Sequence, residues 1–127
     1  MKTVLAIAVG GSLGAVARYY FSIGAAKFLG TALPWGTLLE NLIGCFAMGV
    51  LAELMDIFWT PSEEIKAFLT IGFLGAFTTF STFSLDFALL HGRGELLMGG
   101  LYVLTSVIAS IGGVFLGMLL ILSLIHI

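Results

Sequence analysis

The chain has 127 residues, of which 60% are hydrophobic and only 9% are charged. A soluble domain averages about 45–50% apolar residues and needs more charge than this to cover its surface. The composition therefore indicates an integral membrane protein. The formal net charge of −2 gives no support for a nucleic-acid partner. The single cysteine, Cys45, excludes an internal disulfide, and its apolar neighbours predict a packing role.

Four hydrophobic stretches are each long enough to cross a bilayer, which takes about 20 helical residues. Together they use nearly the whole chain, so we expect one all-α transmembrane domain over residues 1–127. Short connections that contain glycine or proline separate the stretches. The predicted spans cover about residues 3–29, 34–58, 61–90 and 95–125.

The third span carries a start signal and a break signal. Thr60-Pro61-Ser62-Glu63 predicts a helix that begins with Thr60 as its N-cap. Further along, Gly72, Gly75 and the pair Thr78-Thr79 predict a break in the helix. A break at membrane depth is tolerated only where protein buries it or where it lines water. The carbonyl groups that it frees are suitable ligands for a cation such as sodium.

The basic residues outside the spans give no clear orientation. With four crossings, Lys2 and Lys66 lie on one side of the membrane, while Lys27 and Arg93 lie on the other. Because lysine and arginine normally accumulate on the cytoplasmic side, this balance favours insertion in both orientations. Two chains of opposite orientation would then form an antiparallel dimer. The alternative is that so few basic residues do not decide the topology.

Polar side chains occur inside the second and fourth spans. Asn41 is either a tether between helices or a ligand group, and the residues alone favour neither. Tyr102, Ser106 and Ser110 recur every four residues, which places three hydroxyls on one helix face. Each serine alone is weak support, because serines in membrane helices often bond their own backbone. The three together predict a track of hydrogen-bond donors.

The stretch from Gly75 to Ser84 combines hydroxyl groups with phenyl rings in an otherwise apolar span. Polar groups at this depth usually face a cavity or a partner. Phe80 and Phe83 share a helix face if the backbone is helical there. Two ring edges aimed at one point favour a small anion, whereas two ring faces favour a cation. The sequence leaves the ring orientation open.

Three segments together resemble the Fluc (CrcB) family of fluoride channels: Gly10–Tyr19, Gly36–Asn41 and Gly72–Ser84. The resemblance extends over the whole chain in length and span number. It implies a dual-topology homodimer with two antiparallel pores. It also implies passive, selective export of fluoride across the bacterial inner membrane, which relieves fluoride toxicity.

The resemblance also implies roles for particular residues. The backbone carbonyls of Gly75 and Thr78, from both subunits, would hold a structural sodium ion. Arg18 corresponds to the family's first-span arginine, for which we expect a role in vestibule structure or anion attraction. The expected fluoride pore residues are Asn41, Phe80, Ser81, Thr82, Phe83, Tyr102, Ser106 and Ser110.

The chain departs from the family pattern at three positions. Ala76 replaces a frequent second glycine, and Val114 replaces a threonine that often continues the fourth-span track. Glu40 is an unusual acidic neighbour of Asn41. Since consecutive helical residues point about 100° apart, Glu40 need not face the pore, but it would repel an anion if it did.

Other functions remain as alternatives. A small four-helix multidrug exchanger is similar in size and also inserts both ways, but it needs a membrane carboxylate that cycles between proton and substrate. Glu40 and Asp86 are the candidates for that role. A non-conducting packing subunit would not explain the polar tracks. We expect no enzyme, because the sequence shows no nucleophile–base pair and no metal-ligand cluster.

Overall fold

The computed structural model describes residues 1–126, and all regular secondary structure in this range is helical. Three of the spans are continuous helices: α1 (Lys2–Leu29), α2 (Trp35–Ile57) and α6 (Leu96–Ile125). The third span is divided into consecutive pieces: α3 (Glu63–Ala67), the π-helical stretch η1 (Phe68–Leu74), α4 (Gly75–Phe77) and α5 (Ser81–Gly92).

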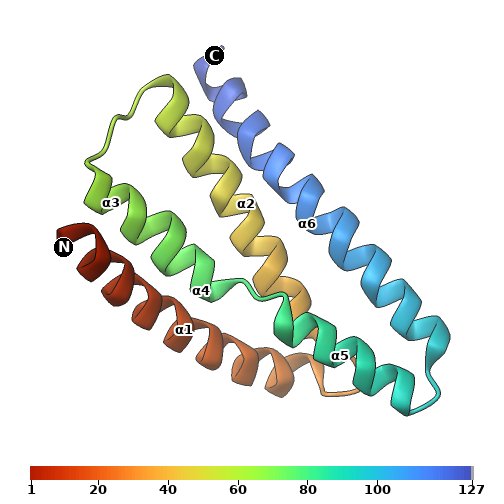
Figure 1. The fold of residues 1–127 in the computed structure, drawn as a ribbon. Helices are drawn as coiled ribbons and strands as arrows, with labels where there is room; N and C mark the ends of the chain where they lie inside the picture. Colours follow the sequence, from red (N-terminus) through yellow and green to blue (C-terminus); the bar gives the residue numbers. More distant parts are fainter. Residues whose placement is uncertain (127) are drawn as a thin grey trace.

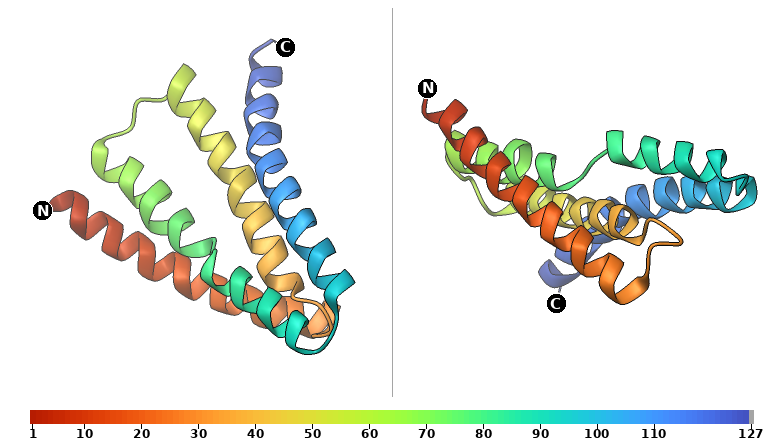
Figure 2. Two further views of the ribbon diagram at one scale, coloured as in Figure 1. Left: turned by 45° about the vertical axis from the view of Figure 1, so that its right-hand side comes forward. Right: turned by 90° about the horizontal axis from the view of Figure 1, so that it is seen from below.

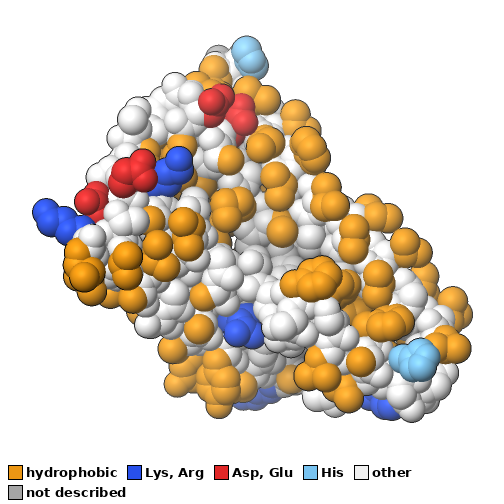
Figure 3. All heavy atoms as spheres, in the orientation of Figure 1, with side chains coloured by type: hydrophobic (Ala, Val, Ile, Leu, Met, Phe, Trp, Pro, Cys, Tyr) orange, Lys and Arg blue, Asp and Glu red, His pale blue; other side chains and the backbone are white. Residues whose placement is uncertain are grey.

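The structure confirms that four helical segments are long and apolar enough to cross a membrane, with the third running from Glu63 to Gly92. Hydrophobic side chains are spread over the whole face shown in Figure 3, and charged groups gather mainly towards its ends. Most of these large apolar side chains are exposed on the single chain, as expected for a surface that meets lipid or another apolar partner.

The helices are arranged so that the third span crosses from one neighbour to another. α3, η1 and α4 lie along α1, whereas α5 lies beside the first half of α6 (Figures 1 and 2). α2 packs chiefly against α6. The N-terminus and the start of α3 lie at one end of the bundle (Figure 1). The connections between α1 and α2 and between α5 and α6 lie at the opposite end. Lys27 and Arg93 therefore share one end.

Glycines allow the α2 and α6 backbones to come into contact. A Cβ atom added to Gly49 would overlap the carbonyl oxygen of Val114, and one added to Gly117 would overlap the carbonyl oxygen of Phe46. Small residues at such crossings are typical of membrane helices, where van der Waals packing replaces the hydrophobic effect between helices. These two glycine contacts hold α2 and α6 together beside the break in the third span.

The third span starts later than the sequence predicts. The hydroxyl of Ser62, not that of Thr60, caps the helix by accepting a hydrogen bond from the Ile65 N–H at 3.2 Å. The prediction of Thr60 as N-cap is therefore wrong, and Pro61 precedes the helix. The physical reason is that serine offers the same cap two residues later, and with Ser62 as the cap both Glu63 and Glu64 lie in the first turn, where the helix dipole favours them.

The predicted break lies where the glycines and threonines place it. α4 ends at Phe77, Thr78 is extended (φ −84°, ψ 155°), and α5 starts at Ser81. The preceding π-helical stretch is a feature that the sequence did not predict. There the N–H of Gly75 reaches the carbonyl of Thr70, five residues back.

Candidate functional site

Asn41 of α2 clamps the extended segment of the break. Its Nδ2 donates to the Thr79 carbonyl at 3.1 Å, and its Oδ1 accepts from the Thr79 N–H at 2.8 Å. The side chain thus supplies both partners that a β-like backbone would normally find in a neighbouring strand. Of the two roles that the sequence leaves open, the tether is present. The second Nδ2 hydrogen is still available to another acceptor.

This clamp leaves two carbonyl groups without their helical donors. In a continuous helix the Thr79 N–H would bond the Gly75 carbonyl, but it bonds Asn41 instead. Likewise the Thr82 N–H, the expected donor to the Thr78 carbonyl, bonds the Thr79 hydroxyl at 3.2 Å. Among residues 1–126, no hydrogen bond reaches either carbonyl outside the helices. Gly75 and Thr78 therefore present free oxygen ligands at the break.

A cavity of about 470 Å³ lies beside the break. It brings together groups from α2, the broken third span and α6. Predicted site residues make up most of its lining: Asn41, Gly75, Thr78, Phe80, Phe83, Ser106 and Ser110. Ser81 is not part of this lining, and its hydroxyl lies 3.4 Å from that of Thr79 at the start of α5.

Two hydroxyls of α6 in this cavity have no hydrogen-bond partner in the part of the chain that the structure describes. Within residues 1–126, the buried Oγ atoms of Ser106 and Ser110 make no hydrogen bond, and Ser106 is only 4% exposed. Buried polar groups in native structures nearly always have a partner, so each exception requires an explanation. These hydroxyls are free to donate to a bound ligand or water.

The two phenyl rings meet edge to face at the same cavity. The centroids of Phe80 and Phe83 are 5.5 Å apart, with an angle of 63° between the ring planes. Their environments differ, because Phe83 is buried in the single chain and Phe80 is 77% exposed. Phe80 thus stands at the open side of the cavity.

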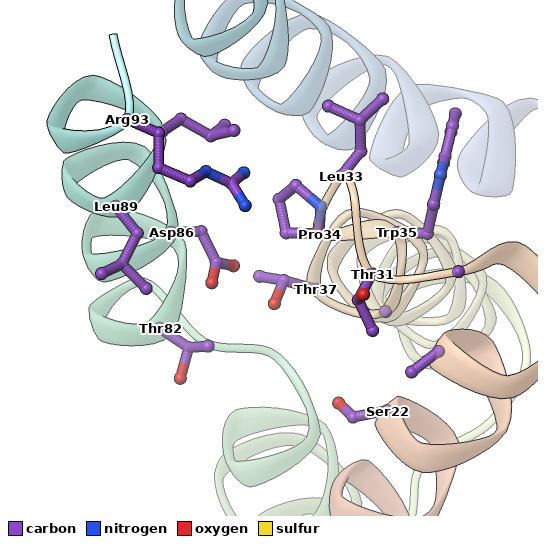
Figure 4. Close-up of a pocket in the computed structure, with 14 residues that line it drawn as sticks. Ser22, Thr31, Leu33, Pro34, Trp35, Thr37, Thr82, Asp86, Leu89 and Arg93 are labelled. Carbon is purple, nitrogen blue, oxygen red and sulfur yellow. The ribbon is translucent and has the colours of Figure 1, made fainter. Parts of the chain in front are cut away.

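A second cavity, of about 350 Å³, lies between α5 and the connection from α1 to α2 (Figure 4). Thr82, Asp86 and Thr37 line it. Tyr102 contacts residues of both cavities. Its ring centroid lies 5.3 Å from that of Phe83, which lines the first cavity, and its hydroxyl donates to the carboxylate of Asp86, in the second cavity, at 3.0 Å. Of these two predicted pore residues, Thr82 lines the second cavity, and Tyr102 lines neither cavity but lies one turn before Ser106 in α6.

Arg18 supports the break from the side of α1. Its Nε donates to the Ala76 carbonyl at 3.0 Å, at the end of α4. A carbonyl at the C-terminal end of a helix lacks a helical donor, and a basic group there also offsets the helix dipole. Arg18 lines neither cavity of the described part of the chain. The Arg18 side chain therefore contacts the helix end that precedes the break.

Glu40 points away from its neighbour Asn41. The carboxyl is fully buried, and its Oε1 accepts a hydrogen bond from the Ser22 hydroxyl of α1. Glu40 does not line the cavity that contains Asn41. The 100° step between helical neighbours thus separates the acidic group from the amide.

The sequence did not predict two lining residues, Thr37 and Cys45, that helical spacing could have indicated. Thr37, Asn41 and Cys45 recur every four residues along α2, in parallel to the hydroxyl track of α6. Asp86 is three residues beyond Phe83 and so shares its face of α5. In the sequence, Cys45 resembles an ordinary packing residue, and only its register with Asn41 indicates otherwise.

Comparison with known proteins decides the family. The model of CrcB-like proteins, described as "CrcB-like protein, Camphor Resistance (CrcB)", matches residues 5–118. The chain belongs to the CrcB family. A CrcB relative from Rhodospirillum centenum is 54% identical over 121 residues, which cover 95% of this chain and 96% of that protein. One from Rhizobium etli is 46% identical over 125 residues, covering 98% and 100%.

Both relatives are named fluoride-specific ion channel FluC. The resemblance seen in the sequence is thereby confirmed. Together with its four apolar helices, the match shows that this CrcB protein is a multi-pass membrane protein. Both relatives carry the name of an ion channel, and ion channels are not enzymes.

Proposed function

We propose that this protein is a passive, fluoride-selective channel that lets fluoride leave the bacterial cytoplasm across the inner membrane and so relieves fluoride toxicity. The names of its relatives support this function. The observation that carries it in this chain is the pair of buried hydroxyls, Ser106 and Ser110, that have no partner among residues 1–126. Such donors are what a small anion without its water shell needs.

The lining of the cavity suits fluoride better than larger anions. Fluoride holds its water strongly, so the protein must replace that water with hydrogen-bond donors. Ser106, Ser110 and the second Nδ2 hydrogen of Asn41 provide such donors. The edges of the Phe80 and Phe83 rings are positive and would add a weak attraction where they face the ion. Several weak sites, one after another along the path, would let the ion leave as well as enter.

The path runs from one cavity to the other. An ion in the second cavity meets Thr82, with Ser81 beside it at the start of α5. It then passes Tyr102, which contacts both Asp86 and Phe83, before it reaches the serines of α6. Along this path the ion would exchange the hydroxyl of Thr82 for those of Ser106 and Ser110.

The antiparallel homodimer, with two pores, belongs to the same proposal. On a single chain, Phe80 and the backbone of Gly75 are exposed at the first cavity, where lipid would meet the ring and the free Gly75 carbonyl. Polar groups in contact with lipid are costly, so a protein partner is the better cover. A second copy in the opposite orientation agrees with the balanced basic residues at the two ends.

The same dimer would create a sodium site. The carbonyls of Gly75 and Thr78 have lost their helical donors, and oxygen ligands of this kind fit a hard cation. Two copies would contribute four such oxygens. A bound sodium ion would supply positive charge that stabilises the junction of the two breaks.

Fluoride efflux from liposomes tests the proposal against the multidrug exchanger. Purified protein is reconstituted in potassium fluoride liposomes, and external fluoride is recorded with an electrode. A passive channel releases fluoride when valinomycin lets potassium follow, with no pH gradient present. Efflux that needs a proton gradient, or no efflux, contradicts the channel. Protein prepared and assayed without sodium tests the cation site, and unchanged efflux there removes sodium from the proposal.

A further inference from the structure

The second cavity contains a basic group that has no assigned role. Arg93, directly after α5, lines this cavity together with Asp86. Figure 4 shows the Arg93 guanidinium and the Asp86 carboxyl pointing into the same space. No other lysine or arginine of the described chain lines it. A positive charge in a half-enclosed cavity attracts anions more strongly than the same charge on an open surface.

The position of Arg93 along α5 places it at the outer part of the cavity. Asp86 is seven residues earlier, about 10 Å deeper along the helix axis at 1.5 Å per residue. An anion coming from the membrane surface therefore meets the guanidinium before the carboxylate. The cavity also lies against the N-terminal end of α2, at Gly36 and Thr37, where the helix dipole favours negative charge.

Part of the guanidinium is engaged and part is free. Nη2 donates to the Ala32 carbonyl at 3.1 Å and lies 3.1 Å from Oε2 of Glu95. Within residues 1–126, the Nε and Nη1 groups make no hydrogen bond or ion pair. The Ala32 bond holds Arg93 over the connection between α1 and α2. The unused N–H groups are therefore held at the cavity as donors.

Glu95 opposes the attraction of Arg93 for anions. Its carboxylate pairs with the guanidinium outside the cavity lining, and both side chains are about half exposed, at 46% and 52%. An exposed pair of this kind adds little to stability. Its negative charge still cancels much of the field that Arg93 projects into the cavity.

We infer that Arg93 concentrates small monovalent anions at the mouth of the second cavity, and that Glu95 limits this effect by pairing with it. The inference depends on the proposed channel function, because it describes how fluoride reaches the path. Arg93 is a residue of ion access, and the selective steps lie deeper. Its contribution should therefore depend on ionic strength, which a purely structural role would not.

The test measures initial fluoride efflux at about 0.01 M and about 1 M ionic strength, where the Debye length falls from about 30 to about 3 Å. At low ionic strength, Arg93→Gln should lower efflux about twofold to threefold, the effect of a unit charge about 8 Å away in water. Glu95→Gln should raise efflux by a similar factor. Both differences should vanish at high ionic strength.

Two further variants separate charge from structure. Lys27→Gln removes a positive charge at the same end of the bundle, but Lys27 does not line the cavity, so its effect should be smaller than that of Arg93→Gln. Arg93→Lys keeps the charge and should conduct like the wild type. If Arg93→Gln fails to fold, Glu95→Gln alone carries the test.

The inference is overturned if Arg93→Gln matches Lys27→Gln, if its loss persists at high ionic strength, if Arg93→Lys is as impaired as Arg93→Gln, or if Glu95→Gln does not raise efflux. Wild-type protein that releases no fluoride under any of these conditions instead contradicts the proposed function itself.

Discussion

The side chain of Asn41 and the backbone of Thr79 exchange two hydrogen bonds across the break in the third span, at 3.1 and 2.8 Å. This pairing has two consequences at once. It satisfies the extended backbone at membrane depth, and it diverts the Thr79 N–H from the Gly75 carbonyl. One amide therefore stabilises the break and exposes an oxygen ligand.

Asn41→Leu removes this clamp while it keeps the branched shape of the side chain. Two backbone groups of Thr79 would be left without partners, each at a cost of about 1–3 kcal/mol. We expect a lower unfolding temperature in detergent and loss of fluoride efflux. Asn41→Asp is the control, because its carboxylate can still accept from the Thr79 N–H; it should recover part of the stability. A leucine variant with wild-type stability would show that the clamp is not needed.

Substitution of either serine of α6 should lower fluoride conduction without lowering the stability of the fold. Their hydroxyls bond nothing among residues 1–126, so Ser106→Ala and Ser110→Ala should leave the unfolding temperature unchanged or raise it. Fluoride efflux should fall about tenfold in each, the effect of losing a hydrogen bond worth about 1.4 kcal/mol in the path.

Ser12→Ala is the matched control for the serines, since the Ser12 hydroxyl bonds its own helix at the Ala8 carbonyl on an exposed face. It should conduct normally. Serine variants of α6 that lose stability but keep efflux would reverse the roles assigned here.

The crossing of α2 and α6 predicts a sharp contrast between two glycines. Gly49→Ala places a methyl group onto the Val114 carbonyl and should destabilise the fold by about 1–3 kcal/mol, as overpacking does. Gly112→Ala, in α6, meets nothing within 4 Å and should be neutral or slightly stabilising. Thermal unfolding of the two variants checks this. Equal effects would mean that the two helices are not in close contact.

Glu40 should matter for stability and not for transport. Glu40→Gln keeps an oxygen that can accept from Ser22, so fluoride efflux should stay within about twofold of the wild type, a change of about 0.4 kcal/mol. Ser22→Ala leaves the buried carboxyl without its donor and should cost about 1–3 kcal/mol of stability. Loss of efflux in Glu40→Gln would instead favour the exchanger, which requires a membrane carboxylate.

Much of this fold could be predicted from one-dimensional patterns. Hydropathy located four spans, and glycines with paired threonines located the break between Phe77 and Ser81. Helical spacing predicted that Ser106 and Ser110 share one surface, and both line the first cavity. These features depend on local sequence, so a single chain contains enough information to place them.

Other features depend on contacts between distant segments. The pairing of Asn41 with Thr79 joins positions 38 residues apart, and no local pattern indicates it. The same holds for Arg18 with Ala76 and for Tyr102 with Asp86. The helix start at Ser62 was missed for a different reason, because neighbouring residues offered two similar caps. The pore roles of individual residues, the sodium ion and the antiparallel dimer stay predictions.

Side-by-side efflux of fluoride and chloride from liposomes containing the purified protein and sodium tests the central claim most directly. If fluoride crosses by exchanging its water for the hydroxyls and amide of this cavity, fluoride should escape quickly. Chloride should stay at the rate of protein-free liposomes. Equal release of both ions, or fluoride release no faster than from protein-free liposomes, would contradict this account.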